Sequence, residues 1–92
     1  MDERNDYNSL IEELPKLTFG SKLVGLTFNP SGDPKVTRVK ELCAELADIL
    51  YEHWTRDAYS EKSNLENQLY NNAVGEILNA QMNVVKLLTF KY

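Results

Sequence analysis

Apolar residues recur every three or four positions in the middle of the chain, which is the spacing of one face of an α-helix. The residues of this stripe are Val36, Val39, Cys43, Leu46, Leu50 and Trp54. Asp33 is a favoured N-cap, and Pro34 is tolerated at the first helical position because its missing N–H would have no partner there. The pattern therefore predicts a long helix over residues 33–57.

A second helix is predicted within residues 60–90, from about 61 to 89. Ser60 is a plausible N-cap, and Glu61 in the first turn would be favoured by the helix dipole. Two neighbouring arcs of this helix are apolar: Leu69, Ala73, Ile77, Ala80, Val84 and Leu88 on one, and Val74, Leu78, Met82 and Val85 on the next. Together they cover well over half of its circumference. A helix with this much apolar surface is buried on more than one side, so we expect an obligate homo-oligomer.

The first third of the chain has a different character. All three prolines and three of the four glycines precede residue 35. Residues 6–14 are predicted to form a short helix that stops at Pro15, and residues 17–28 have β-rich character that suits a small hairpin or an extended arm. We therefore expect one all-α domain over residues 1–92. It would consist of an N-terminal helix and an irregular loop arm (1–32), then an antiparallel helical hairpin, assembled as a homo-oligomer.

Composition narrows the function classes. The net charge of −4 argues against a dedicated binder of nucleic-acid polymers, whose domains usually carry a basic surplus. No stretch approaches the roughly 18 apolar residues of a membrane span, and the polar, acidic N-terminus does not resemble a signal or transit peptide. The single cysteine, Cys43, cannot form an internal disulfide, which fits a reducing cytoplasm.

The chain has few residues of the types that form catalytic or metal sites. His53 is the only histidine and has no neighbouring ligands at metal-binding spacing. Cys43 falls on the apolar stripe, where packing explains it best. No nucleophile with a base, phosphate-binding glycine loop or carboxylate pair can be identified. We therefore expect a protein that is not an enzyme and that uses no metal or cofactor.

Three cations without an intervening carboxylate begin the first long helix: Lys35, Arg38 and Lys40. A helix N-terminus offers unpaired N–H groups and about half a positive charge, so added cations suit a phosphate. The alternative is an ordinary solvated helix start. Lys40 lies on the shoulder of the buried stripe and Arg38 on the opposite side, so Lys40 is the cation expected at an interface. Phe28 and Tyr7 could stack on a base or complete a core.

These residues carry a resemblance to a known family. Phe28-Asn29-Pro30, a glycine-containing turn and a helix with Val39-Lys40 followed by Ala44-Glu45-Leu46-Ala47 resemble the phage anti-CBASS cyclic-nucleotide sponges. A second stretch that begins Ser60-Glu61-Lys62-Ser63 resembles the second helix of that family. The similarity covers about residues 26–88, and the family shares its helical hairpin with sponges of Thoeris signalling molecules.

The resemblance implies a function and a site. Such proteins are helical homo-oligomers, typically hexamers, that bind cyclic di- and trinucleotides between subunits in the host bacterial cytoplasm and release them intact. Phe28 would stack on a base and Lys40 would lie near a phosphate. The remaining candidates for this pocket are Asn29, Pro30, Thr37 and Tyr7. The resemblance also implies a second site, for cyclic trinucleotides, at Ser60 and Lys62; Glu61 stands where the family has arginine, so Lys62 would substitute.

Three other functions remain open. The first is a helical oligomer whose apolar surface docks a host protein. The second is a sponge for an ADP-ribose-type Thoeris signal, which the sequence barely separates from a cyclic-dinucleotide sponge. A small enzyme that degrades the signal is a distant third.

Overall fold

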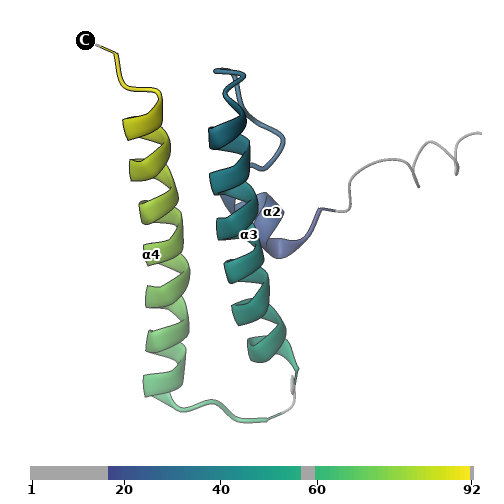
Figure 1. Cartoon of the computed structure of the whole chain (residues 1–92). Coiled ribbons are helices and arrows are strands. Elements are labelled where there is room, and N and C mark those ends of the chain that lie inside the picture. The colour runs from purple at the N-terminus through teal and green to yellow at the C-terminus, as the bar shows by residue number, and fades with distance from the viewer. Residues whose placement is uncertain (1–16, 57–59, 92) are drawn as a thin grey trace, which may run out of the picture.

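The regular secondary structure of the described residues is entirely α-helical. The computed structural model describes residues 17–56 and 60–91, which hold three α-helices and no strand (Figure 1). The helices are α2 (Phe19–Val24), α3 (Pro34–Thr55) and α4 (Asn64–Leu88). The all-α prediction is confirmed for this part of the chain. The helix predicted over residues 6–14 lies outside the described residues.

Helix α2 replaces the hairpin or extended arm predicted over residues 17–28, so that prediction is wrong. The Thr18 hydroxyl caps its first turn by accepting a hydrogen bond from the Ser21 N–H at 3.1 Å. Gly25 ends the helix with a left-handed φ of 62°, and its N–H is directed at the carbonyls of Lys22 and Ser21. Threonine before a helix and glycine after it are ordinary capping residues. These two caps outweigh the β propensity of the residues between them.

The two long helices begin at side-chain caps. Helix α3 starts as predicted, because the Asp33 carboxylate accepts from the Lys35 N–H at 2.9 Å and Pro34 follows it. Helix α4 starts later than predicted: Ser63, not Ser60, is its N-cap and accepts from the Glu66 N–H at 3.1 Å. Ser63 has a glutamate three residues on, which is the spacing of a capping box, whereas Ser60 has a serine there.

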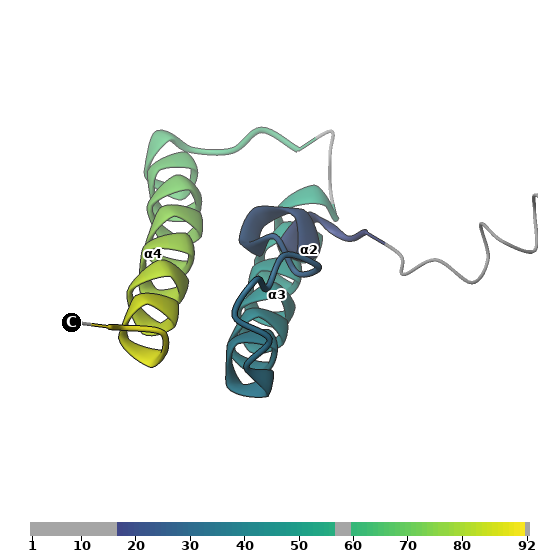
Figure 2. The same cartoon turned by 90° about the horizontal axis from the view of Figure 1, so that it is seen from above.

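Helices α3 and α4 lie side by side and form a layer (Figures 1 and 2). At one end of the layer the rings of Trp54 and Tyr70 stack, with centroids 4.5 Å apart and planes 4° apart. Helix α2 packs on one side of this layer, mainly against α3, and no described helix covers the other side. The layer therefore has one partly covered side and one uncovered side.

Helix α2 approaches α3 closely because Gly20 has no side chain. A Cβ at Gly20 would lie only 2.0 Å from the carbonyl oxygen of Ala44. Asp48 fixes the same junction, because its carboxylate accepts from the Gly20 N–H at 2.6 Å and from the Thr18 hydroxyl at 2.7 Å. These contacts select the buried face of α3, which consists of Val36, Lys40, Ala44 and Ala47.

That buried face corrects the predicted stripe on the first long helix. Of the predicted stripe, Val36 is buried, whereas Leu46 is 50% exposed and Cys43 is half-buried. The small side chains one step around the helix are buried instead, since only they admit the backbone of α2. The spacing of apolar residues predicted the helix, but it did not predict the face of that helix on which α2 packs.

The apolar core of one copy is small. Within residues 17–56 and 60–91 the buried apolar residues are Val24, Val36, Ala44, Ala47 and Ile77. Twelve large apolar side chains are exposed, among them Leu46, Leu69 and Leu87. One copy thus exposes more large apolar side chains than it buries. In the same part of the chain no helix is long and apolar enough to cross a bilayer.

Replacing Gly20 by alanine should weaken the fold, whereas the same change at Gly75 should not. The added methyl group at Gly20 would collide with α3 backbone, which we expect to cost about 1–3 kcal/mol in the free energy of unfolding. At Gly75, inside α4, an added Cβ meets nothing within 4 Å, so Gly75→Ala should stabilise by up to about 1 kcal/mol. Urea unfolding at one fixed protein concentration measures both. Equal stability of Gly20→Ala and the unchanged protein would contradict the close contact of α2 with α3.

Candidate binding site

One pocket collects most of the residues that the sequence singled out. It has a volume of about 210 Å³ and lies where the loop after α2, the start of α3 and the end of α4 meet. We call it the Phe28 pocket. Its lining residues are Phe28, Asn29, Pro30, Ser31, Val36, Lys40, Val85 and Thr89. Four of the six predicted nucleotide-binding residues therefore share one cavity, although they come from two different segments.

The loop that forms one wall of the pocket is held by a chain of hydrogen bonds. Gly32, at φ 70°, completes a turn in which its N–H donates to the Asn29 carbonyl at 3.2 Å. The Asn29 amide donates to the Asp33 carbonyl and to the Thr37 hydroxyl, both at 2.9 Å. Ser31 donates to the Asn29 side-chain oxygen at 2.6 Å. Asn29 therefore fastens the turn to the first two turns of α3.

Lys40 is buried beneath this loop. It is 6% exposed, and its Nζ donates to the carbonyl oxygens of Phe28 at 2.5 Å and of Gly25 at 3.1 Å. A buried ammonium group is tolerated when such acceptors replace its water. Two of its three N–H donors are thus engaged by the backbone. Lys40 organises the loop, and contact of its Nζ with a phosphate stays a prediction.

Phe28 provides the exposed aromatic surface of the pocket. Phe28 is 68% exposed, although its backbone is held on both sides. Its N–H donates to the Gly25 carbonyl at 2.9 Å, and its own carbonyl accepts from Lys40. The Nζ of Lys40 lies 5.5 Å from the ring centroid, within the range of a cation–π contact. An exposed ring on a fixed backbone is available for stacking against a planar group.

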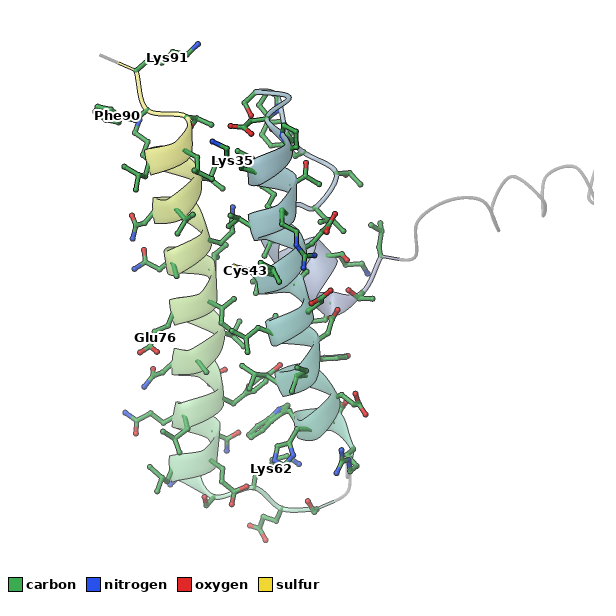
Figure 3. All side chains as sticks on the ribbon, viewed as in Figure 1. Lys35, Cys43, Lys62, Glu76, Phe90 and Lys91 are labelled. Atoms are coloured by element: carbon green, nitrogen blue, oxygen red, sulfur yellow. The ribbon has the colours of Figure 1, made fainter. Side chains whose placement is uncertain are left out.

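Three lysines lie at this end of the layer. Lys35 lies in the first turn of α3, Lys86 lies in the last turn of α4, and Lys91 follows it. Figure 3 shows Lys35 and Lys91 at the same end of the layer. Arg38 is different, since it is exposed on α3 and forms an ion pair with Glu41 at 3.1 Å, as its predicted position on the wheel suggested. Of the cations at this end, Lys40 is the one that lines the Phe28 pocket, and the Asp33 carboxylate that caps α3 lies at the same end. The lysines outnumber this carboxylate, which favours an anionic ligand.

The other predicted residues lie elsewhere. The Thr37 hydroxyl is occupied by the Asn29 amide, and Thr37 does not line the pocket. Tyr7 lies outside the described residues. Lys62 is at the opposite end of the layer (Figure 3), so the two predicted sites are far apart along the helices. Ser60 precedes it in the connection to α4.

The pocket beside Lys62 is larger, at about 390 Å³, and we call it the Trp54 pocket. It is lined by Leu50, His53, Trp54, Lys62, Glu66, Leu69, Tyr70 and Ala73. The Lys62 Nζ lies 5.0 Å from the Trp54 ring, whose plane stacks on Tyr70. Sequence reasoning missed this aromatic pair, because Trp54 was placed on the apolar stripe and Tyr70 was not singled out. Ser60 is not among the lining residues.

Burial shifts the pKa values of Cys43 and Tyr70. Burial raises the pKa of the Cys43 thiol, so the thiol stays protonated and less nucleophilic at neutral pH. Burial, with a smaller contribution from Tyr51, raises the pKa of Tyr70. Neither group lines the Phe28 pocket. Among the residues described here, no three His, Cys, Asp or Glu side chains gather as they would around a metal ion.

Lys40→Met should destabilise the fold, whereas Lys35→Met should not. Methionine keeps the aliphatic bulk but leaves the Gly25 and Phe28 carbonyls without their donor, which we expect to cost about 1–3 kcal/mol in the free energy of unfolding. Lys35 is exposed, so its replacement should change stability by no more than about 0.5 kcal/mol. Denaturant unfolding of both variants measures the difference. Equal stabilities would show that Lys40 does not hold the loop.

Known proteins do not identify this chain. Comparison with protein-family models, with curated proteins and with solved structures found no match.

Proposed function

We propose that this chain binds cyclic dinucleotides and sequesters them without hydrolysis, as a phage protein that blocks CBASS-type immunity in the bacterial cytoplasm. The observation that carries the proposal is the Phe28 pocket. It combines an exposed aromatic residue, Phe28, with one lining cation, Lys40, and further lysines lie at the same end of the layer. An aromatic surface suits a base, and positive charge suits a phosphate. The resemblance of residues 26–88 to the anti-CBASS sponges supplies the ligand class.

Each part of the pocket has a distinct task in this proposal. The Phe28 ring stacks on a base, a contact worth about 1–3 kcal/mol. Lys35 and Lys86 attract the phosphates from the same end of the layer, against the opposing charge of the Asp33 carboxylate that caps α3. Lys40 holds the Gly25 and Phe28 carbonyls in place and adds its charge from beneath the loop. Asn29 and Pro30 shape the wall, and Thr37 supports it through Asn29.

A second copy is needed to complete the site. Ligand pockets commonly have volumes of about 300–1,000 Å³, and the Phe28 pocket has about 210 Å³. A cyclic dinucleotide has two bases and two phosphates, so a twofold subunit contact can present the same ring and cations to each half. We propose a homo-oligomer of antiparallel α3–α4 hairpins, of the hexameric type that the resemblance implies. Binding alone requires no general base.

The Trp54 pocket is the place for the second ligand that the resemblance implies, a cyclic trinucleotide. Its stacked Trp54 and Tyr70 rings and the Lys62 ammonium provide aromatic surface and a cation. Glu61 and Glu66 place negative charge nearby, and a phosphate would be repelled by them. We rank this site below the Phe28 pocket.

Two alternatives compete with the proposal. A protein-interaction module is favoured by the many large apolar side chains exposed on one copy, and it predicts no stabilisation by nucleotides. A sponge for an ADP-ribose-type signal would use the same aromatic ring and cations on a different ligand. A thermal-shift screen with cyclic dinucleotides, cyclic trinucleotides and ADP-ribose derivatives separates the three, because a ligand that binds only the folded state raises Tm by mass action.

Phe28→Ala should weaken nucleotide binding by about 10–100-fold, with little effect on stability. The ring is mostly exposed in one copy, so removing it eliminates a stacking surface rather than a core contact. Calorimetric titration with the cyclic dinucleotide that gives the largest thermal shift measures the change. Phe90→Ala is the matched control, because Phe90 is also half exposed, lies near Lys86 and does not line the pocket.

Two outcomes would contradict the proposal. Equal affinities of the Phe28 and Phe90 variants would reject the pocket assignment. Recovery of cleaved rather than intact nucleotide after denaturing the complex would reject sequestration in favour of an enzyme.

A further inference from the structure

The uncovered side of the α3–α4 layer contains an apolar groove. It has a volume of about 360 Å³ and is lined by Cys43, Leu46, Leu50, Ala73, Glu76, Ile77 and Ala80. Helix α2 lies on the other side of the layer, where it packs on Ala44 (Figures 1 and 2). We call the surface around this groove the open face. In the structure of one copy, no described helix covers it.

The open face has both projections and hollows. Leu69, Ala73, Glu76, Ala80 and Leu87 follow helical spacing of three and four, so they share one face of α4. Leu69 is 59% exposed and Leu87 is 77% exposed, and the small side chains of Ala73 and Ala80 line the groove between them. On α3, Leu46 lines the groove and is 50% exposed. Large and small side chains therefore alternate on a single surface.

We infer that a second copy of this chain packs its open face against this one around a twofold axis. A twofold contact requires a patch that is complementary to itself. The open face meets that requirement, because leucines of one copy can enter the alanine-lined groove of the other by ridges-into-grooves packing. This contact is separate from the Phe28 pocket and holds without any nucleotide.

One whole side of the α3–α4 layer is about as large as a stable interface. Helix α4 has 25 residues, hence a length of about 37 Å, and two adjacent helices, each about 10 Å wide, present about 740 Å². A standard stable complex buries about 800 Å² on each partner. A peptide or a single docked helix would cover only part of this surface.

The charges of the open face also permit self-association. Glu76 is the one charged residue among those that line the groove, and it is exposed (Figure 3). It can therefore stay at the solvated edge of the contact, and burial of the groove leaves no ion without water. The small core of one copy gives the driving force, since the exposed leucines gain burial only from a partner.

Sedimentation velocity of the full chain over a dilution series, without nucleotide, tests this inference. The unchanged protein should sediment as an oligomer, and Leu46→Glu should raise the dissociation constant of the contact by at least about tenfold. The twofold axis places each substitution in the contact twice. Met82→Glu is the matched control, because Met82 is 57% exposed and does not line the groove, and at two residues from Ala80 it lies on nearly the opposite side of α4.

A second pair of variants, on α4, keeps the test decisive if the variants of the first pair fail to fold. Ala80→Arg fills the groove from an exposed position, and Asn79→Arg places the same side chain on the neighbouring exposed residue. Circular dichroism should show unchanged helix content in both, and only Ala80→Arg should dissociate. A monomeric unchanged protein, or equal effects in either pair, would overturn the inference. Nucleotide titration of the same proteins separates the two proposals: a failure of the open face leaves an oligomer that Leu46→Glu does not dissociate, whereas a failure of the Phe28 pocket leaves an oligomer that binds no nucleotide.

Discussion

The arrangement of the candidate site depends on one buried ammonium group. The Nζ of Lys40 donates to the carbonyls of Gly25 and Phe28, which lie at the beginning of the loop that leaves α2. A charge removed from water needs such partners, because an unpaired buried ion is very costly. The loop is therefore held at the position where its carbonyls satisfy Lys40. Phe28 follows from this constraint: its backbone is fixed by Lys40 while its ring remains exposed.

The sequence predicted those features that are set by local chemistry. Asp33 and Pro34 marked the start of α3 correctly, because capping depends on neighbouring residues alone. The same logic, applied at Ser60, failed for α4 because Ser63 has the better-placed glutamate. The wheel placed Lys40 beside the buried stripe but could not identify its acceptors. Those acceptors belong to a loop whose position depends on α2, a helix that was predicted as a hairpin or extended arm.

Packing explains why the buried face of α3 was also mispredicted. Periodicity ranks positions by side-chain hydrophobicity, so Leu46 was preferred to Ala47. The contact of Gly20 with the Ala44 backbone rewards small side chains instead, because only these allow α2 to come close. Leu46 is left exposed on the other side of the layer. A single close backbone contact thus fixes which side of α3 is internal and which apolar side chains remain for a partner.

This division links the fold of one copy to the proposed assembly. The Phe28 pocket lies on the end of the layer that α2 and its loop organise, and the groove between α3 and α4 lies on the uncovered side. The pocket presents an aromatic ring beside Lys40, with further lysines at the same end of the layer. The groove presents leucines and alanines with a single acidic side chain among its lining residues. Water and salt weaken attraction between exposed charges, whereas apolar contact is stable without a ligand. The open face is therefore the surface suited to hold copies together permanently, which leaves the charged end to exchange a small anion.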